Sequence, residues 1–267
     1  GHGAIRAHAQ IHPPDSFTRN LNAKPIHYNW SCVWLYRHGM ASLRSPFSDR
    51  SIPQRLGPGQ RCMRPRGEGG FDRWRVPVEN ALRDAYLTLR AGLTPRQRGR
   101  LEAQVVRHLT ELEAYRSADL LLAYVAYRDE MDTRAMCERA WADGKSVALP
   151  RCEGGERSLA FYVVDTLEGL APGARGALEP VVDDGDVSLD PTALQTSVCL
   201  VPGLVFDAAG YRVGYGAGYY DNFLAGYVGT KVGVVHAMQV SGNPLPHDEH
   251  DVAVDVLVSD GAIWMCR

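Results

Sequence analysis

A glycine-rich stretch, Val201–Leu224, constrains the fold of this 267-residue chain more than any other segment. An apolar run at 198–205 predicts a buried strand that leads into a loop. Four glycines then follow within nine positions, at 210, 214, 216 and 218. Glycines at this density allow positive φ angles and let backbone N–H groups approach a ligand. A helix is predicted to begin near Tyr219, so strand, loop and helix N-terminus together would form a cradle for phosphate.

Glycine spacing alone leaves a second interpretation open, an ordinary turn between a strand and a helix. The segment GYGAG is not the dinucleotide-binding pattern, because no acidic residue follows at the expected distance. Two charged residues make the phosphate interpretation more specific. Arg212 precedes the last three glycines and is a possible charge partner for phosphate. Asp221 closes the segment and offers a carboxylate of the kind that Mg²⁺ accepts.

Composition limits the class of protein. The hydrophobic fraction of 45% is ordinary for a globular chain, and no apolar run approaches the roughly 20 residues that a membrane-spanning helix needs. The six cysteines contain no CxxC pair, which argues against a zinc site and against a dense disulfide framework. We therefore expect reduced thiols, a cytoplasmic location and no association with membranes.

The net charge of −2 hides two segments of opposite sign. Residues 1–75 contain 12 Lys and Arg against 4 Asp and Glu, whereas residues 76–267 contain 17 against 27. The first segment is rich in Pro, Gly, Ser and Arg and lacks sustained periodicity, which favours a poorly ordered extension. The sequence thus predicts a basic extension at 1–75 and a folded domain at 76–267. A basic tail also leaves nucleic-acid binding open as a separate function.

Helices and strands alternate along the second segment. Apolar spacing predicts helices at 77–92 and 132–142, and Thr94-Pro95 is a typical helix start for a further helix that reaches Leu112. Strands are predicted at 120–126, 146–149, 159–164, 198–205, 231–235 and 252–258. This alternation predicts a three-layer α/β/α sandwich with a mostly parallel, Rossmann-like sheet. Ligands of such sheets lie beyond the carboxyl ends of the strands, where Glu130, the glycine loop and the loop before Val252 are expected to meet.

Several motifs in the same order resemble one known family. They are ALR at 81–83, YVAYRDEMDT at 124–133, ALP at 148–150, G-x-x-EP at 176–180, VPGLVFD at 201–207, RVGYGAGYYD at 212–221, MQ at 238–239 and PHDEHD at 246–251. Together they resemble the 5-formyltetrahydrofolate cyclo-ligases, also called methenyltetrahydrofolate synthetases. The resemblance extends from about Glu79 to Val258. It implies ATP- and Mg²⁺-dependent conversion of 5-formyltetrahydrofolate to 5,10-methenyltetrahydrofolate, with release of ADP and phosphate, by a monomer.

The resemblance also implies roles for individual residues. Catalytic roles fall to Arg212, Tyr219 and Asp221. ATP binding falls to Arg83, Arg212, Val213, Gly214, Tyr215, Gly216, Ala217, Gly218, Tyr219 and Tyr220. Binding of the folate substrate falls to Val125, Glu130, Tyr215 and Tyr219, and Mg²⁺ binding to Asp221 and Asp251.

Simpler interpretations of the same side chains stay open. Asp221 would be favoured by the helix dipole alone, and Asp251 could be an ordinary turn residue. Glu130 could cap the following helix, and Arg83 could be a solvated charge on a helix.

The chain also departs from the family pattern. Glu79 stands where a basic residue is usual, with Arg73 or Arg75 as the nearest replacements. Ala217 stands where Lys is common, and Arg175 where an aromatic residue is usual. These departures leave open an alternative function, a non-catalytic protein of the same fold that binds folate or nucleotide.

Overall fold

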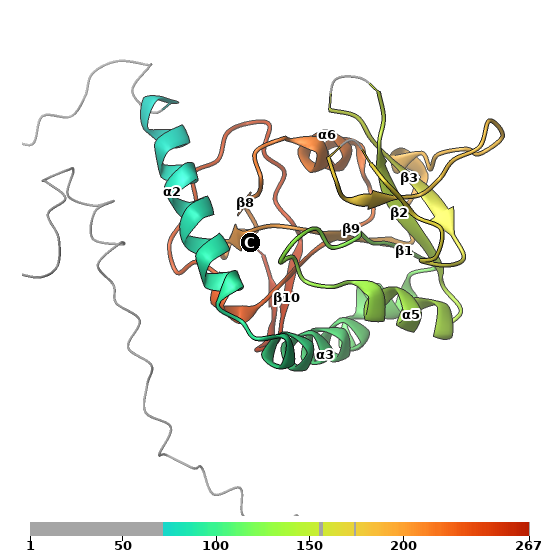
Figure 1. Cartoon of the computed structure of the whole chain (residues 1–267), viewed down its shortest axis with the longest axis horizontal. Coiled ribbons are helices and arrows are strands. Elements are labelled where there is room, and N and C mark those ends of the chain that lie inside the picture. The colour runs from blue at the N-terminus through green and yellow to red at the C-terminus, as the bar shows by residue number, and fades with distance from the viewer. Residues whose placement is uncertain (1–71, 155–156, 174, 267) are drawn as a thin grey trace, which may run out of the picture. The chain divides into compact units, whose positions relative to one another are not determined.

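A computed structural model describes residues 72–154, 157–173 and 175–266 (Figure 1). Its α-helices are α2 (Asp72–Ala91), α3 (Pro95–Glu111), α4 (Glu113–Ser117), α5 (Arg134–Ala142) and α6 (Tyr219–Gly226), and its 3₁₀ helices are η2 (Pro191–Ala193) and η3 (Ala237–Gln239). The main sheet contains β1 (Leu120–Leu122), β2 (Ser146–Cys152), β3 (Leu159–Val164), β6 (Ser197–Val201), β9 (Thr230–Val235), β10 (Val256–Ser259) and β11 (Ile263–Met265). Two small hairpins pair β4 (Ala171–Pro172) with β5 (Leu178–Glu179) and β7 (Val205–Phe206) with β8 (Arg212–Val213).

The seven-stranded sheet has the order β11-β10-β9-β6-β1-β2-β3. Its five inner strands are parallel, and the two edge strands, β3 and β11, run antiparallel to their neighbours. The predicted α/β fold with a mostly parallel sheet is therefore confirmed. None of the helices in the described part of the chain is long and apolar enough to cross a membrane.

Alternating side chains of the sheet enter two separate cores. One core packs the sheet against α3, α4 and α5, and the other packs it against α6 and the β7–β8 hairpin, so helices cover both faces (Figure 1). The strand residues of the first core include Leu121, Val147, Val198, Val232 and Val256, and those of the second include Leu122, Ala148, Cys199, Val201 and Leu257. A third, smaller cluster joins α2 to the hairpin through Leu82 and Tyr86.

Local signals placed the helices well. The hydroxyl of Thr94 accepts a hydrogen bond from the Gln97 amide, and the Gln97 side chain accepts one from the Thr94 amide, which forms a complete capping box. The helix predicted to end at 142 does so, and Gly144 follows it with a φ of 77°. Helix α2 begins at Asp72, five residues before the predicted start, and contains Pro77. The helix therefore includes the last four residues of the predicted extension. The rest of that extension, residues 1–71, lies outside the described residues.

The first and the last of the predicted strands are shorter than expected, because side chains bind their backbone groups. The first ends at Leu122 rather than at 126, since the Tyr124 carbonyl accepts a hydrogen bond from the Thr133 hydroxyl and the Tyr127 amide donates to Glu130. The last parallel strand begins at Val256 rather than at 252. Upstream of it, the Val252 amide donates to Asp221. Antiparallel β11 was not predicted.

A hairpin separates the fourth inner strand from the glycine loop, whereas the sequence predicted one strand at 198–205. The strand ends at Val201, and the β7–β8 hairpin follows. Its turn contains Gly210, which has a φ of 87° and approaches Val254 so closely that a Cβ would lie 2.3 Å from the Val254 carbonyl oxygen. Gly210 therefore belongs to the hairpin turn and not to the predicted phosphate cradle. The segment at 166–191, predicted as mostly loop, contains β4, β5 and the start of η2 at Pro191.

The buried His236 makes the stability of the fold depend on pH. His236 follows β9, and its side chain is 1% exposed. Burial lowers its pKa from 6.5 to about 4, although the negative charge of Asp260 acts to raise that pKa. The unfolded chain therefore takes up a proton first as the pH falls, and stability is lost between about pH 6.5 and 4. The loss is about 3 kcal/mol. Denaturant unfolding at pH 7.5 and 4.5 should show a clearly smaller loss in His236→Gln, whereas His250→Gln, at a side chain that is 86% exposed, should behave like the unaltered chain.

Candidate functional site

The glycine loop, residues 214–218, joins β8 to the first turn of α6. Gly216 and Gly218 have φ angles of 86° and 71°, and Gly218 is the N-cap of α6. A Cβ at Gly216 would lie 3.0 Å from Nη2 of Arg83, so the loop backbone and this guanidinium are in close contact. The backbone amides at the start of α6 have no partners within the helix and are oriented to receive an anion.

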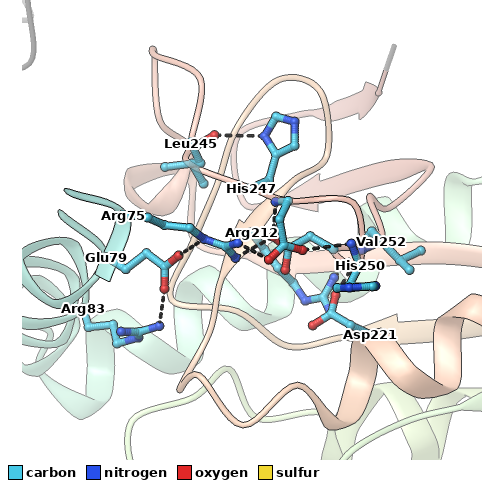
Figure 2. Close-up of polar contacts among 11 residues, drawn as sticks. Arg75, Glu79, Arg83, Arg212, Asp221, Leu245, His247, His250 and Val252 are labelled. Carbon is cyan, nitrogen blue, oxygen red and sulfur yellow. Dashed lines mark hydrogen bonds and ion pairs between the residues drawn. The ribbon is translucent and has the colours of Figure 1, made fainter. Parts of the chain in front are cut away.

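Arg212 and Asp221 meet on either side of this loop. Nη2 of Arg212 donates to Oδ1 of Asp221 at 2.9 Å, and Nη1 donates to the Val252 carbonyl at 2.7 Å. The Val252 amide returns a hydrogen bond of 3.1 Å to the same Asp221 oxygen. The Arg212 side chain is 7% exposed and the Asp221 side chain 23%. The contacts join the hairpin, α6 and the loop before β10 at one point (Figure 2).

One face of α2 brings a chain of charges to the same place. Arg75, Glu79 and Arg83 follow at intervals of four residues, and Glu79 accepts from Nε of Arg75 at 2.6 Å and from Nη2 of Arg83 at 2.7 Å. Arg83 also donates from Nε to the Gly214 carbonyl at 2.9 Å. Nη2 of Arg75 lies 2.8 Å from Oδ2 of Asp251. The acidic Glu79 thus orients two arginines, one toward the glycine loop and one toward the loop of Asp251.

Ion pairs shift the acid–base behaviour of this group. Burial acts to lower the pKa of Arg75, but its hydrogen bonds to Glu79 and Asp248 outweigh burial and raise the pKa overall. The hydrogen bond from Arg75 holds the pKa of Asp248 below its usual value. Both groups are therefore fixed in their charged forms across the neutral range.

Two tyrosines, Tyr127 and Tyr215, connect Glu130 with the glycine loop. Oε2 of Glu130 accepts from the Tyr127 amide at 2.9 Å, and the Tyr127 ring contacts the Tyr215 ring edge-on, with centroids 6.3 Å apart. The Tyr215 hydroxyl accepts from Nη2 of Arg90 at 3.0 Å. Burial raises the pKa of Glu130, while the Tyr127 amide and the charge of Arg90 act in the opposite direction.

Val125 lines a small cleft of about 30 Å³ at the carboxyl end of β1. Most of its walls are apolar, and Asp132, Thr133 and Arg134 add the polar groups. The remaining lining residues are Tyr124, Ala126, Leu167, Leu170 and Leu178. This volume is far below the roughly 300–1,000 Å³ of small-molecule pockets, and Glu130 does not line the cleft.

The two tyrosines that open α6 differ in environment. The Tyr219 ring lies under the guanidinium of Arg175, whose Cζ is 5.1 Å from the ring centroid, and Nη2 of Arg175 donates to the Tyr219 hydroxyl at 3.2 Å. An arginine here thus stacks on an aromatic side chain of the site. The Tyr220 ring packs against both cores, and its buried hydroxyl has no partner among the described residues. Its side chain therefore faces the interior and not the loop.

The remaining predicted residues fall into two groups. Val213 is buried against α2, so only its backbone could face a ligand, and Ala217 contributes no side-chain hydrogen bond.

The simpler interpretations of the site residues have different outcomes. Arg83 is bonded and partly buried rather than solvated, and Glu130 is not the cap of α5, because the N-cap is Thr133. Asp251 does take part in a turn, since it accepts from the Asp248 amide at 2.7 Å.

Two carboxylates are suited to holding a magnesium ion. Oδ2 of Asp221 and Oδ1 of Asp251 accept no hydrogen bond from the part of the chain that the structure describes. Within the same residues, no group of three or more His, Cys, Asp or Glu side chains is arranged around a metal position. Mg²⁺ commonly takes only one or two protein carboxylates and completes its shell with water and phosphate oxygens, so the free oxygens of the two aspartates are of the type that the ion accepts.

Sequence reasoning missed Arg90, which is 2% exposed and contacts the glycine loop through Tyr215. A basic residue in the last turn of a helix is usually explained by its favourable interaction with the helix dipole. For this reason Arg90 did not stand out as a site residue. A helical projection would have found it, since residues 75, 79, 83 and 90 lie along one face. Arg157 was missed as well; its Nη1 lies 3.5 Å from the position of a Cβ at Gly218.

Comparison with known proteins agrees with the geometry. A family model described as the 5-formyltetrahydrofolate cyclo-ligase family matches residues 75–260. A 5-formyltetrahydrofolate cyclo-ligase of Escherichia coli is 27% identical over 179 residues, which cover 66% of this chain and 96% of the relative. A probable enzyme of the same name from Schizosaccharomyces pombe is 27% identical over 168 residues, which cover 58% and 81%.

Two solved structures are similar as well. The NMR structure of Aquifex aeolicus 5,10-methenyltetrahydrofolate synthetase is 31% identical with a TM-score of 0.61, and the match covers 71% of this chain and 93% of that chain. The synthetase of Mycoplasma pneumoniae, 20% identical with a TM-score of 0.54, shares the fold over 68% and 98% of the two chains. The motifs, the fold and the family model agree over the same residues, and the chain belongs to the 5-formyltetrahydrofolate cyclo-ligase family.

Proposed function

We propose that the chain is an ATP- and Mg²⁺-dependent 5-formyltetrahydrofolate cyclo-ligase. The observation that carries this proposal is the junction of Arg212, Asp221 and Val252, because it joins both ends of the motif at 212–221 to the residue that follows the motif at 246–251. In the proposed reaction the formyl oxygen of the folate takes the γ-phosphoryl group of ATP, and ADP leaves. N10 then attacks the activated carbon, phosphate departs with the former formyl oxygen, and 5,10-methenyltetrahydrofolate remains.

The residues of the chain would act mainly by position and charge. Phosphoryl transfer needs aligned reactants and neutralised phosphate oxygens more than covalent help from the protein. The loop amides and Arg212 suit the nucleotide phosphates, and Arg83 suits a phosphate on the α2 side. Glu130 suits the hydrogen-bond donors of the folate ring, and Tyr219 offers a flat aromatic surface for the same ring. Asp221 and Asp251 would hold Mg²⁺, which supplies charge neutralisation at the phosphates.

A second candidate function is binding of folate or nucleotide without turnover. Arg75 favours it, because this guanidinium already neutralises the carboxylate of Asp251 and would compete with a metal ion there. We propose turnover as the main function because Glu79 holds Arg75 and Arg83 in one network, which supplies basic groups despite the acidic residue at 79. We also propose a cytoplasmic monomer that does not bind nucleic acid through its α/β domain.

A spectrophotometric assay tests the proposed function directly. The purified full-length chain is mixed with 5-formyltetrahydrofolate, ATP and Mg²⁺, and the near-ultraviolet absorbance of the methenyl product is followed. We expect the absorbance to rise only when both ATP and Mg²⁺ are present, and chelation with EDTA to stop the rise. Folate binding without an absorbance change would instead support the second candidate, and absence of both would contradict the two together.

A further inference from the structure

Arg90, in the last turn of α2, is a buried cation with an incomplete set of partners. The residue is 2% exposed. Its Nη2 donates to the Tyr215 hydroxyl at 3.0 Å, and its Nε is buried with no hydrogen-bond partner among the described residues. A guanidinium carries five N–H donors in a fixed fork, so most of its capacity to bind an acceptor is unused.

The missing partner should be an anion. A buried charge is strongly unfavourable unless it is paired and hydrogen-bonded, yet in residues 72–154, 157–173 and 175–266 no carboxylate forms an ion pair with Arg90. The charge of Arg90 acts on Glu130, but among the described residues no hydrogen bond or ion pair joins the Glu130 carboxylate to Arg90. The Tyr215 phenol is neutral, and burial raises its pKa further. The protein thus supplies Arg90 with a neutral partner where a negative one is required.

The position of Arg90 indicates which anion would come close. Tyr215 belongs to the glycine loop, and its ring contacts Tyr127, whose amide binds Glu130. Arg90 therefore lies against the tyrosine that connects the glycine loop with the neighbourhood of Glu130. Other charges around it are already engaged: Arg98 pairs with Asp129, and His236 is buried with its pKa lowered to about 4.

We propose that Arg90 is an anion-binding residue of this site and that it contacts the phosphoryl group as that group passes from nucleotide to folate. The inference rests on the proposed function for the identity of the phosphoryl group. It rests on the contacts of Arg90 alone for the presence of an anion-binding position. Nε and the free Nη donors of Arg90 would bind phosphoryl oxygens side by side, the paired geometry that makes guanidinium–phosphate contacts strong.

Arg90→Met separates this role from a structural one. Met keeps an unbranched side chain of similar length and removes the charge. We expect the melting temperature of the ligand-free protein to rise by about 2–5 °C, since an uncompensated buried charge is lost. We expect kcat of the cyclo-ligase assay to fall about tenfold with a smaller change in KM. Arg90→Lys, which keeps a charge, should recover part of kcat.

A binding measurement makes the test independent of turnover. Pyrophosphate is titrated into the full-length protein by calorimetry, and we expect its Kd to rise about tenfold in Arg90→Met. Arg139→Met, at an exposed ion pair with Asp143 on α5, is the control and should leave Kd unchanged. A fall in melting temperature and activity together, with an unchanged Kd, would show that Arg90 is structural and would overturn the proposal. If the unaltered protein lacks cyclo-ligase activity but pyrophosphate binding still depends on Arg90, only the proposed function fails.

Discussion

Asp221→Asn should lower turnover by about a hundredfold or more while the protein stays folded. Asparagine keeps the oxygen that accepts from Arg212 and from the Val252 amide, so the junction can persist. The substitution removes the negative charge that would ligate Mg²⁺, and a metal-stabilised transition state loses several kcal/mol without it; about 2.7 kcal/mol already corresponds to a hundredfold. Turnover is measured in the absorbance assay over a range of Mg²⁺ concentrations, and the half-saturating concentration should rise.

The loss of stability in Asp221→Asn should be modest, and a control variant can reproduce it. A hydrogen bond to a charged group contributes about 2 kcal/mol, which predicts a fall of roughly 6 °C in melting temperature. Asp255 is the matched control, because it also accepts from a backbone amide and a cation, the Lys231 amide at 2.7 Å and Nζ at 3.3 Å. Asp255→Asn should lose a similar or smaller stability and keep turnover within about twofold. Near wild-type turnover in Asp221→Asn would remove Asp221 from the metal site.

Local chemistry explains which features the sequence could predict. The capping box of Thr94, the end of α5 before Gly144 and the start of α6 after Gly218 each depend on a few adjacent residues. The glycine loop was found for the same reason, since the positive φ angles at Gly216 and Gly218 depend on the residue type at each position. Strand cores were also predictable, because runs of apolar residues must be buried in a parallel sheet.

Long-range contacts explain what the sequence could not predict. Val252 reads as a strand residue, but its amide binds Asp221, which lies 31 positions away. Arg75 appeared to belong to a poorly ordered basic segment, yet it pairs with Asp251, 176 positions away. Arg90 resembles a surface helix residue until the Tyr215 loop covers it, 125 positions later. In each case a distant side chain decides the environment, and no local pattern records it.

Gly216→Ala should lower kcat/KM for ATP by roughly five- to tenfold. Gly216 has a φ of 86°, and an added Cβ would lie 3.0 Å from Nη2 of Arg83. To relieve this contact, either the loop or the guanidinium must shift, and Arg83 would lose its alignment with the Gly214 carbonyl and with Glu79. Misplacement of a site group by about 1 Å can reduce the rate a hundredfold, and a shift of a few tenths of an ångström, which a contact of 3.0 Å requires, reduces it less. Steady-state kinetics with ATP as the varied substrate measures the effect.

Gly144→Ala separates this contact from backbone strain. Gly144 has a φ of 77°, close to that of Gly216, but a Cβ there would meet nothing within 4 Å. Both substitutions should therefore lower the free energy of unfolding by about 1–2 kcal/mol through the left-handed backbone, while only Gly216→Ala should lose kcat/KM. Arg83→Ala completes the test as a double-mutant cycle: once the guanidinium is gone, adding the methyl group at Gly216 should have a much smaller kinetic effect. An undiminished effect would show that Arg83 does not transmit the damage, and that the loop backbone itself must keep its conformation for ATP to bind.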